Sequence, residues 1–262
     1  MRLNKYIGDA GYCSRREADR LIEAGKVAVN GKTALVGMQV KEGDTVTVDG
    51  VLVGRSETDH KIIYAFYKPR GVVCTMADEP DSLFRFLKNR CLENPFSENG
   101  FSARVYPIGR LDKDSDGLVL LTNDGELTNR ILKTADNHQK EYAVKVNKDI
   151  TDAFIRGMAA GVEIVDGNKG VKVTTRKCRV EKTGRRSFII VLEQGLNRQI
   201  RRMCGAFGYE VTALRRVRIM NIRLNGLKEG GIRVLTEEEE TRLRELCEYG
   251  EKGRSRKSDG ED

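Results

Sequence analysis

The feature that most constrains the fold is a series of short, β-rich apolar runs that begins near residue 61. The runs are KIIYAFY, GLVLL, EYAVKV, VKVTTRKCRV, SFIIVLE and EVTALRRVRI. Between and after them lie the helix candidates GELTNRILK, TDAFIRGMAAG, NRQIRRMCGAFG and TEEEETRLRELCEY, with Thr151 as the N-cap of the second. Strands that mix with helices without a regular βαβ rhythm predict an α+β domain around a mixed sheet.

The first 50 residues predict a separate small module. Ser14 and Glu17 form a capping box at the start of a second helix, and two short alternating runs follow, which end at Asn-Gly and Asp-Gly turns. The polar segment VGRSETDH then separates this module from the rest, and GEKGRSRKSDGED has no apolar residue. We therefore predict a module at 1–50, a linker at 51–60, a main domain at 61–249 and a disordered tail at 250–262.

Composition excludes several classes of protein. No segment of the 262 residues approaches twenty apolar residues, and the N-terminus lacks the apolar core of a signal peptide, which predicts a cytoplasmic protein without a membrane anchor. The six cysteines form no CxxC pair and the two histidines lie far apart. A zinc site and a disulfide framework are both disfavoured.

Positive charge is concentrated in one segment. The segment between Asn197 and Arg223 contains seven arginines and a single acid, Glu210, in a chain of formal net charge +8. Such an excess beside apolar residues favours a face that binds phosphate.

Acidic residues gather in GRLDKDSDGLVLLTNDG, which holds four aspartates. Asp112, Asp114 and Asp116 have the spacing of the start of a calcium loop. Asn123 stands where the bidentate Glu of such a loop belongs, and Pro107 precedes the loop where a helix would enter. Calcium binding is therefore a disfavoured third interpretation.

Four motifs resemble known families. SRREADRLIEAGKVAVNG resembles the S4 RNA-binding domain, and GRLDKDSDGLVLLTNDG, KEYAV and GLNRQIRRMCGAFGYEV resemble three separated motifs of the pseudouridine synthases. Together they match the RsuA-type ribosomal branch, and RIMN after the last motif is most similar to its RluF-type large-subunit enzymes. The resemblance implies a small α/β S4-like domain before a catalytic domain whose mixed, mostly antiparallel sheet has flanking helices.

The resemblance also implies a set of site residues. Asp112 matches the catalytic aspartate, Tyr142 the tyrosine that packs against the target base, and Arg201 the basic partner of the aspartate. The other three aspartates of the stretch, Asp114, Asp116 and Asp124, are then expected to be structural or solvated, with Asp124 as a cap or turn residue before GELTNRIL. Arg110 matches the residue that fills the gap left by a flipped nucleotide. Further RNA-binding residues are expected on the S4-like helix pair and along the basic segment: Lys5, Arg15, Arg16, Arg198, Arg202, Arg215, Arg216 and Arg218.

The implied reaction converts uridine to pseudouridine without net redox change, so no cofactor and no metal are expected. The implied partner is ribosomal RNA, 23S in preference to 16S. Ribosome assembly intermediates and a tRNA stem-loop are further expected substrates, and the protein is expected to be a monomer. Asp112 could attack C1′, add to C6 or take a proton from the sugar. The alternative is a non-catalytic S4-type RNA-binding or ribosome-assembly factor in which Asp112 is structural.

Overall fold

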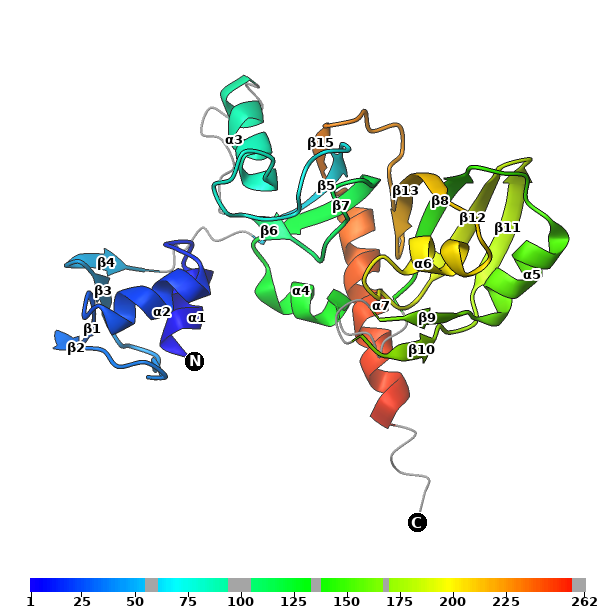
Figure 1. Cartoon of the computed structure of the whole chain (residues 1–262). Helices are drawn as coiled ribbons and strands as arrows, with labels where there is room; N and C mark the ends of the chain where they lie inside the picture. The colour runs from blue at the N-terminus through cyan, green and yellow to red at the C-terminus, as the bar shows by residue number, and fades with distance from the viewer. Residues whose placement is uncertain (55–60, 94–104, 133–137, 167–169, 256–262) are drawn as a thin grey trace, which may run out of the picture.

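The computed structural model describes residues 1–54, 61–93, 105–132, 138–166 and 170–255 (Figure 1). An N-terminal domain precedes a larger domain built around a large mixed sheet. Among the described residues, no helix is long and apolar enough to cross a membrane.

The N-terminal domain packs two helices on a four-stranded sheet of order β2-β1-β3-β4. Its elements are α1 (Leu3–Asp9), α2 (Arg15–Glu23), β1 (Val27–Val29), β2 (Lys32–Thr33), β3 (Val46–Val48) and β4 (Val51–Val53). Ser14 Oγ accepts a hydrogen bond from Glu17 N at 3.1 Å, which confirms the predicted cap of α2. Strand β4 pairs with β3. The predicted start of the linker at residue 51 is therefore wrong, because the sheet continues to Val53; residues 55–60 lie outside the described residues.

The larger domain contains a mixed sheet of order β11-β12-β8-β13-β7-β5-β15, with β6 beside β7 and β14 beside β13. Its strands are β5 (Ile63–Lys68), β6 (Tyr106–Pro107), β7 (Asp116–Thr122), β8 (Lys140–Val146), β11 (Arg179–Gly184), β12 (Ser187–Leu192), β13 (Val211–Ile219), β14 (Ile222–Arg223) and β15 (Ile232–Val234). Of the described strand pairs in this sheet, β13 and β7 run parallel and the others antiparallel. The expected mixed, mostly antiparallel sheet is confirmed.

Helices flank this sheet as α3 (Leu83–Glu93), α4 (Gly125–Leu132), α5 (Asp152–Ala160), α6 (Gln199–Ala206) and α7 (Glu237–Ser255). The four predicted helices are present, and Thr151 caps α5 by accepting from Phe154 N. Helix α3 was not predicted. The run VKVTTRKCRV forms two strands, β10 (Lys172–Thr174), which pairs with β9 (Glu163–Val165), and the start of β11.

The predicted disordered tail is wrong for residues 250–255, which continue α7 to Ser255. A helix already nucleated by the packed turns at Leu243 and Cys247 can extend into polar sequence, because each added residue gains a backbone hydrogen bond. The prediction for 256–262 lies outside the described residues.

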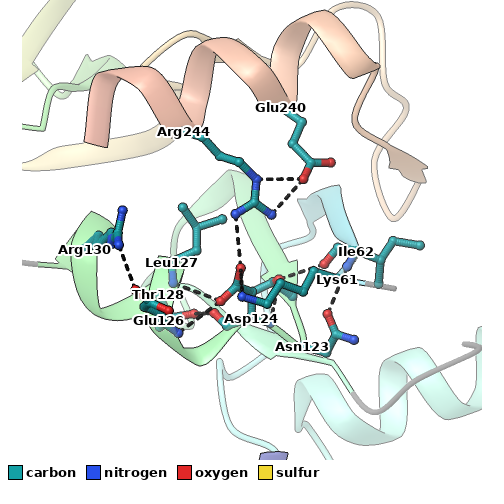
Figure 2. A network of polar contacts seen from close by, with 11 residues as sticks. Lys61, Ile62, Asn123, Asp124, Glu126, Leu127, Thr128, Arg130, Glu240 and Arg244 are labelled. Atoms are coloured by element: carbon teal, nitrogen blue, oxygen red, sulfur yellow. Dashed lines mark hydrogen bonds and ion pairs between the residues drawn. The ribbon is translucent and has the colours of Figure 1, made fainter. Parts of the chain in front are cut away.

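Asp124 joins three elements at one buried point (Figure 2). Its carboxylate accepts from Glu126 N and Leu127 N at 3.1 Å each and so caps α4, as predicted. It also lies 3.2 Å from Arg244 Nη1 of α7 and 3.3 Å from Lys61 Nζ. Burial would raise the pKa of Asp124, but the Leu127 amide and the two cations outweigh it and hold this pKa below its ordinary value.

We expect Asp124→Asn to lower the free energy of unfolding by about 1–3 kcal/mol at pH 7, because it removes two ion pairs from a buried carboxylate. The folded-state pKa of Asp124 lies below its ordinary value, so the full difference in unfolding free energy between wild type and variant is expected above about pH 4. This difference should shrink as pH falls from there through the folded-state pKa of Asp124. Urea titrations at pH 7 and pH 3 measure both effects. Glu126→Gln, which breaks the exposed pair with Arg130, is the control and should change stability by under about 0.5 kcal/mol.

Candidate active site

Asp112 lies on the loop of residues 108–115, which joins β6 to β7. Hydrogen bonds to other elements hold the residues just before Asp112, and one bond within the loop follows it. Arg216 of β13 donates to the Arg110 carbonyl at 3.3 Å, and Leu111 N donates to Cys74 Sγ at 3.4 Å. Ser115 N donates to the carbonyl of Asp112 at 3.1 Å. These bonds hold the loop that carries the partly exposed Asp112 carboxylate just before the start of β7, an interior strand of the sheet.

The loop enters β7 where this strand meets β13. Gly117 pairs with Arg216 across the parallel pair and has φ +111°, a conformation that favours glycine. A Cβ at residue 117 would collide with the backbone oxygen of Arg216. The glycine therefore permits the close approach that places the Asp112 loop beside β13. Because β8 pairs with the other edge of β13, the same contact fixes the distance from the loop to β8.

Two arginines from the start of α6 bind the loop carboxylates. Arg198 donates to both oxygens of Asp114, at 3.1 and 2.8 Å, and its Nη1 lies 3.8 Å from Asp112 Oδ2. The hydrogen bonds from Arg198 are the main cause of an Asp114 pKa below its ordinary value. Asp114 is thus structural, as expected.

Arg201, predicted as the basic partner of Asp112, forms its ion pair in this structure with Asp114. Its Nε lies 3.3 Å from Asp114 Oδ2, and its guanidinium donates to Asp114 O, Ser115 Oγ and Val211 O at 3.1–3.2 Å. The ion pairs of the described residues join Asp112 to Arg198 instead. Arg198 is the N-cap of α6 and has a left-handed backbone, φ 50°, and its side chain is more exposed than that of Arg201, 43% against 15%.

Asp116 has a similar structural role at the first position of β7. Arg215 Nη2 donates to its carboxylate at 2.8 Å, and the Tyr67 hydroxyl donates at 3.4 Å. Burial, followed by the charge of Asp116, raises the pKa of Tyr67 to about 12. Asp114 and Asp116 are both bound by guanidinium groups, and no cluster of three or more potential metal ligands occurs in the described part of the chain.

Asp112 and Tyr142 line one cavity of about 320 Å³. Tyr142 lies on β8 opposite Arg216 of β13, and Arg110, Arg198 and Lys140 also contribute to the wall. The apolar part is formed by Ile108, Leu111, Ile131, Leu192, Leu196, Ile200, Leu214 and Ile219. The volume lies within the range of small-molecule sites, which combine an apolar wall with few polar groups.

Three of the predicted phosphate-binding arginines donate hydrogen bonds to acceptors within the protein. Arg216 is buried, with 3% of its surface exposed, and donates to Leu118 O at 2.7 Å. Arg218 donates to Glu141 at 2.8 Å, and Arg202 donates to Asn197 Oδ1 and to the Val165 carbonyl. Part of the hydrogen-bonding capacity of these three side chains is thus used within the protein, and their phosphate contacts stay a prediction.

The remaining predicted RNA-binding residues lie at the surface. Arg110, Arg198 and Arg215 are exposed, as are Lys5 and Arg16 on the N-terminal helix pair. Arg15 is also exposed but pairs with Asp9 at 3.2 Å. It lies at the junction of the two domains, because a Cβ at Gly125 of α4 would be 3.3 Å from Arg15 Nη2.

Lys140 is a cavity residue that the sequence prediction missed. Burial lowers its pKa to about 8, and the Arg216 guanidinium adds to this effect. The signal was present in KEYAV, because residues two apart on a strand share a face and Lys140 therefore accompanies Tyr142.

Comparisons with known proteins agree with this architecture. The RNA pseudouridylate synthase family matches residues 62–206, and the S4 domain family matches residues 1–46. A dual-specificity RNA pseudouridine synthase RluF from Salmonella typhi is 50% identical over 248 residues, which are 94% of this chain and 80% of that protein. The ribosomal large subunit pseudouridine synthase B of Bacillus subtilis is 38% identical over 251 residues, 95% of this chain and 98% of that protein.

A solved structure extends the comparison to three dimensions. The crystal structure of a pseudouridylate synthase is similar with a TM-score of 0.63 and 26% identity, and the match covers 93% of this chain and 99% of that one. The chain therefore belongs to the RNA pseudouridylate synthase family and carries an N-terminal S4 domain. The enzymatic interpretation is supported over a non-catalytic RNA-binding factor.

Substitution of Arg201 should affect mainly stability, whereas substitution of Arg198 should affect mainly the reaction rate. We expect Arg201→Met to lower the melting temperature by several degrees, because it leaves Asp114 and two loop acceptors without a buried donor. Arg198→Met should keep the melting temperature within about 2 °C of wild type, because this side chain is exposed. It should lower the single-turnover rate, because the variant lacks the guanidinium beside Asp112. Thermal melts and rates measured on both variants test this. Equal stability of the two would show that Arg201 does not hold the loop.

Proposed function

We propose that this protein isomerises uridine to pseudouridine in large-subunit ribosomal RNA, with Asp112 as the catalytic carboxylate. The observation that carries the proposal is the cavity in which Asp112, Tyr142 and Arg198 meet. A target nucleotide that leaves its stack can enter this space and lie with its base against Tyr142. Stacking on the ring offsets part of the few kcal/mol that base flipping costs.

Within this proposal each side chain has a separate task. The Asp112 carboxylate reacts with the nucleotide, and the Arg198 guanidinium, 3.8 Å away, is the cation with which it pairs. Arg110 is exposed two residues earlier on the same loop and is suited to fill the gap in the RNA stack. Arg201 is a positioning residue, because it acts on the loop through Asp114 and Ser115.

The substrate assignment rests on the relatives and on the basic surface. The two relatives are named as a large-subunit enzyme and as a dual-specificity RNA enzyme, which favours 23S over 16S ribosomal RNA and leaves room for a second substrate such as a tRNA stem-loop. Ribosome assembly intermediates present the same RNA before it is covered by proteins. We further infer a cytoplasmic monomer, which matches the location of such substrates.

Asp112→Asn should abolish release of tritium from ribosomal RNA labelled at uridine C5, because the amide cannot react as the carboxylate does. RNA affinity should stay within about threefold of wild type, because most contacts with RNA are made to phosphates and Asp112 is not one of the groups that make them. The matched control is Asp81→Asn, which removes an exposed carboxylate paired with Lys113 of the same loop. Release of tritium by Asp112→Asn at the wild-type rate would overturn the catalytic assignment.

The N-terminal domain should anchor RNA through its helix pair. We expect the double variant Lys5→Gln, Arg16→Gln to weaken binding on all RNA sequences alike and to flatten the plot of log affinity against log salt by about 1.5 units. The control pair Lys32→Gln, Lys41→Gln removes the same charge from exposed positions off the helices. Affinities measured at several salt concentrations compare the two. An equal loss of RNA affinity in the two double variants would mean that the domain attracts RNA by its overall charge and not through the helix pair.

A further inference from the structure

We propose that Lys140, supported by Arg216, is a second catalytic residue that stabilises the negative charge formed on the uracil oxygens during the reaction. This inference rests on the proposed function, because it assumes that the base of a uridine occupies the cavity beside Tyr142. It adds a charge of opposite sign to that of Asp112 in the same cavity.

The sheet brings the two cations to the base-binding face. Lys140 and Tyr142 are two residues apart on β8, so their side chains share a face. Arg216 pairs with Tyr142 across β13 and β8, and Ile219 pairs with Lys140. All four line the cavity. A base that lies against the Tyr142 ring therefore has Lys140 and Arg216 along its edge.

Both cations have donors to spare among the described residues. Lys140 Nζ donates to the His138 carbonyl at 3.3 Å and forms no ion pair there. Arg216 Nη2 is buried and has no hydrogen-bond partner in the same part of the chain. Uncompensated charge in a partly apolar cavity is unfavourable, and such preorganised groups are typical of sites where opposite charge develops during reaction.

The other charged groups around the cavity do not neutralise Lys140. Asp112 and Arg198 lie 3.8 Å apart, and Glu193 accepts from Gln139 at 3.3 Å. Arg110 and His138 complete the titratable lining. Glu141, the next residue on β8, is bound by Arg218 at 2.8 Å. Burial and then Arg216 lower the pKa of Lys140 to about 8, so most of the ammonium is still protonated at neutral pH.

The chemistry requires a cation at this place. When the N1–C1′ bond breaks, its electron pair stays with the base, and the resulting anion shares its charge among N1, O2 and O4. The charge on the base is neutralised when C5 bonds to C1′. The C5 hydrogen then leaves as a proton, its electron pair restores the ring double bond and returns charge to the O4 and N1 side of the ring, and N1 takes up a proton to give neutral pseudouridine. If Asp112 instead adds to C6, the displaced electron pair moves onto O4. Each route places negative charge on a uracil oxygen, and Asp112, itself an anion, cannot stabilise it.

We expect Lys140→Met to lower the single-turnover rate at saturating RNA by about 10²–10³-fold, the effect of removing one preorganised donor, with a much smaller change in RNA affinity. Lys145→Met is the matched control, because Lys145 is exposed on the same strand and, five positions away, faces the opposite side. It should keep the full rate. Thermal melts of both variants show whether either loses stability.

The pH profile separates charge from packing. The wild-type rate should decline above about pH 8, as Lys140 loses its proton. Lys140→Arg should recover part of the rate lost in Lys140→Met and should lack this decline, because a guanidinium stays charged. A full rate in Lys140→Met, or an unchanged decline in Lys140→Arg, overturns the inference. If Asp112→Asn remains inactive in that case, the proposed function stands and only the role of Lys140 falls.

Discussion

The contact between β7 and β13 at Gly117 is the constraint on which the rest of the site depends. The two backbones approach so closely there that a Cβ at residue 117 would collide with the Arg216 oxygen. β7 carries the Asp112 loop at its start, and β13 carries β8, with Tyr142, on its other edge. The spacing of these three neighbouring strands therefore fixes how far the carboxylate lies from the tyrosine. A cavity of about 320 Å³ results from this spacing and from the start of α6.

Arginine serves two different purposes in this chain. Arg201, Arg216 and Arg218 bind carbonyls and carboxylates of the sheet and of the Asp112 loop, so part of the basic segment is consumed by the fold itself. A planar group with five donors can join several backbone acceptors at once, which suits irregular loops. Other basic residues, such as Arg110, Arg198 and Lys5, are exposed, and we propose that these carry the charge that binds RNA. A basic segment is thus not equivalent to a basic surface.

With the proposed function, the cavity places opposite charges at separate points along one nucleotide. Asp112 stands at the loop edge, whereas Lys140 and Arg216 lie on the sheet face beside Tyr142. Such an arrangement can act on the sugar or ring carbon with an anion while it holds charge on the base oxygens. No reorganisation is needed at the moment of reaction, because the strands already fix both groups.

The sequence by itself determined the features that depend on local patterns. Alternation predicted most strands, Ser14, Asp124 and Thr151 were predicted as caps, and three motifs predicted the family. The partners of Arg201 and Arg216 and the place of Lys140 in the cavity required the tertiary structure. Each depends on which strands become neighbours and on a left-handed residue at Arg198. Similarly, β4 and the end of α7 are stabilised by pairing and by propagation from packed turns. Charge and propensity describe what a side chain can do, and only packing decides which partner it meets.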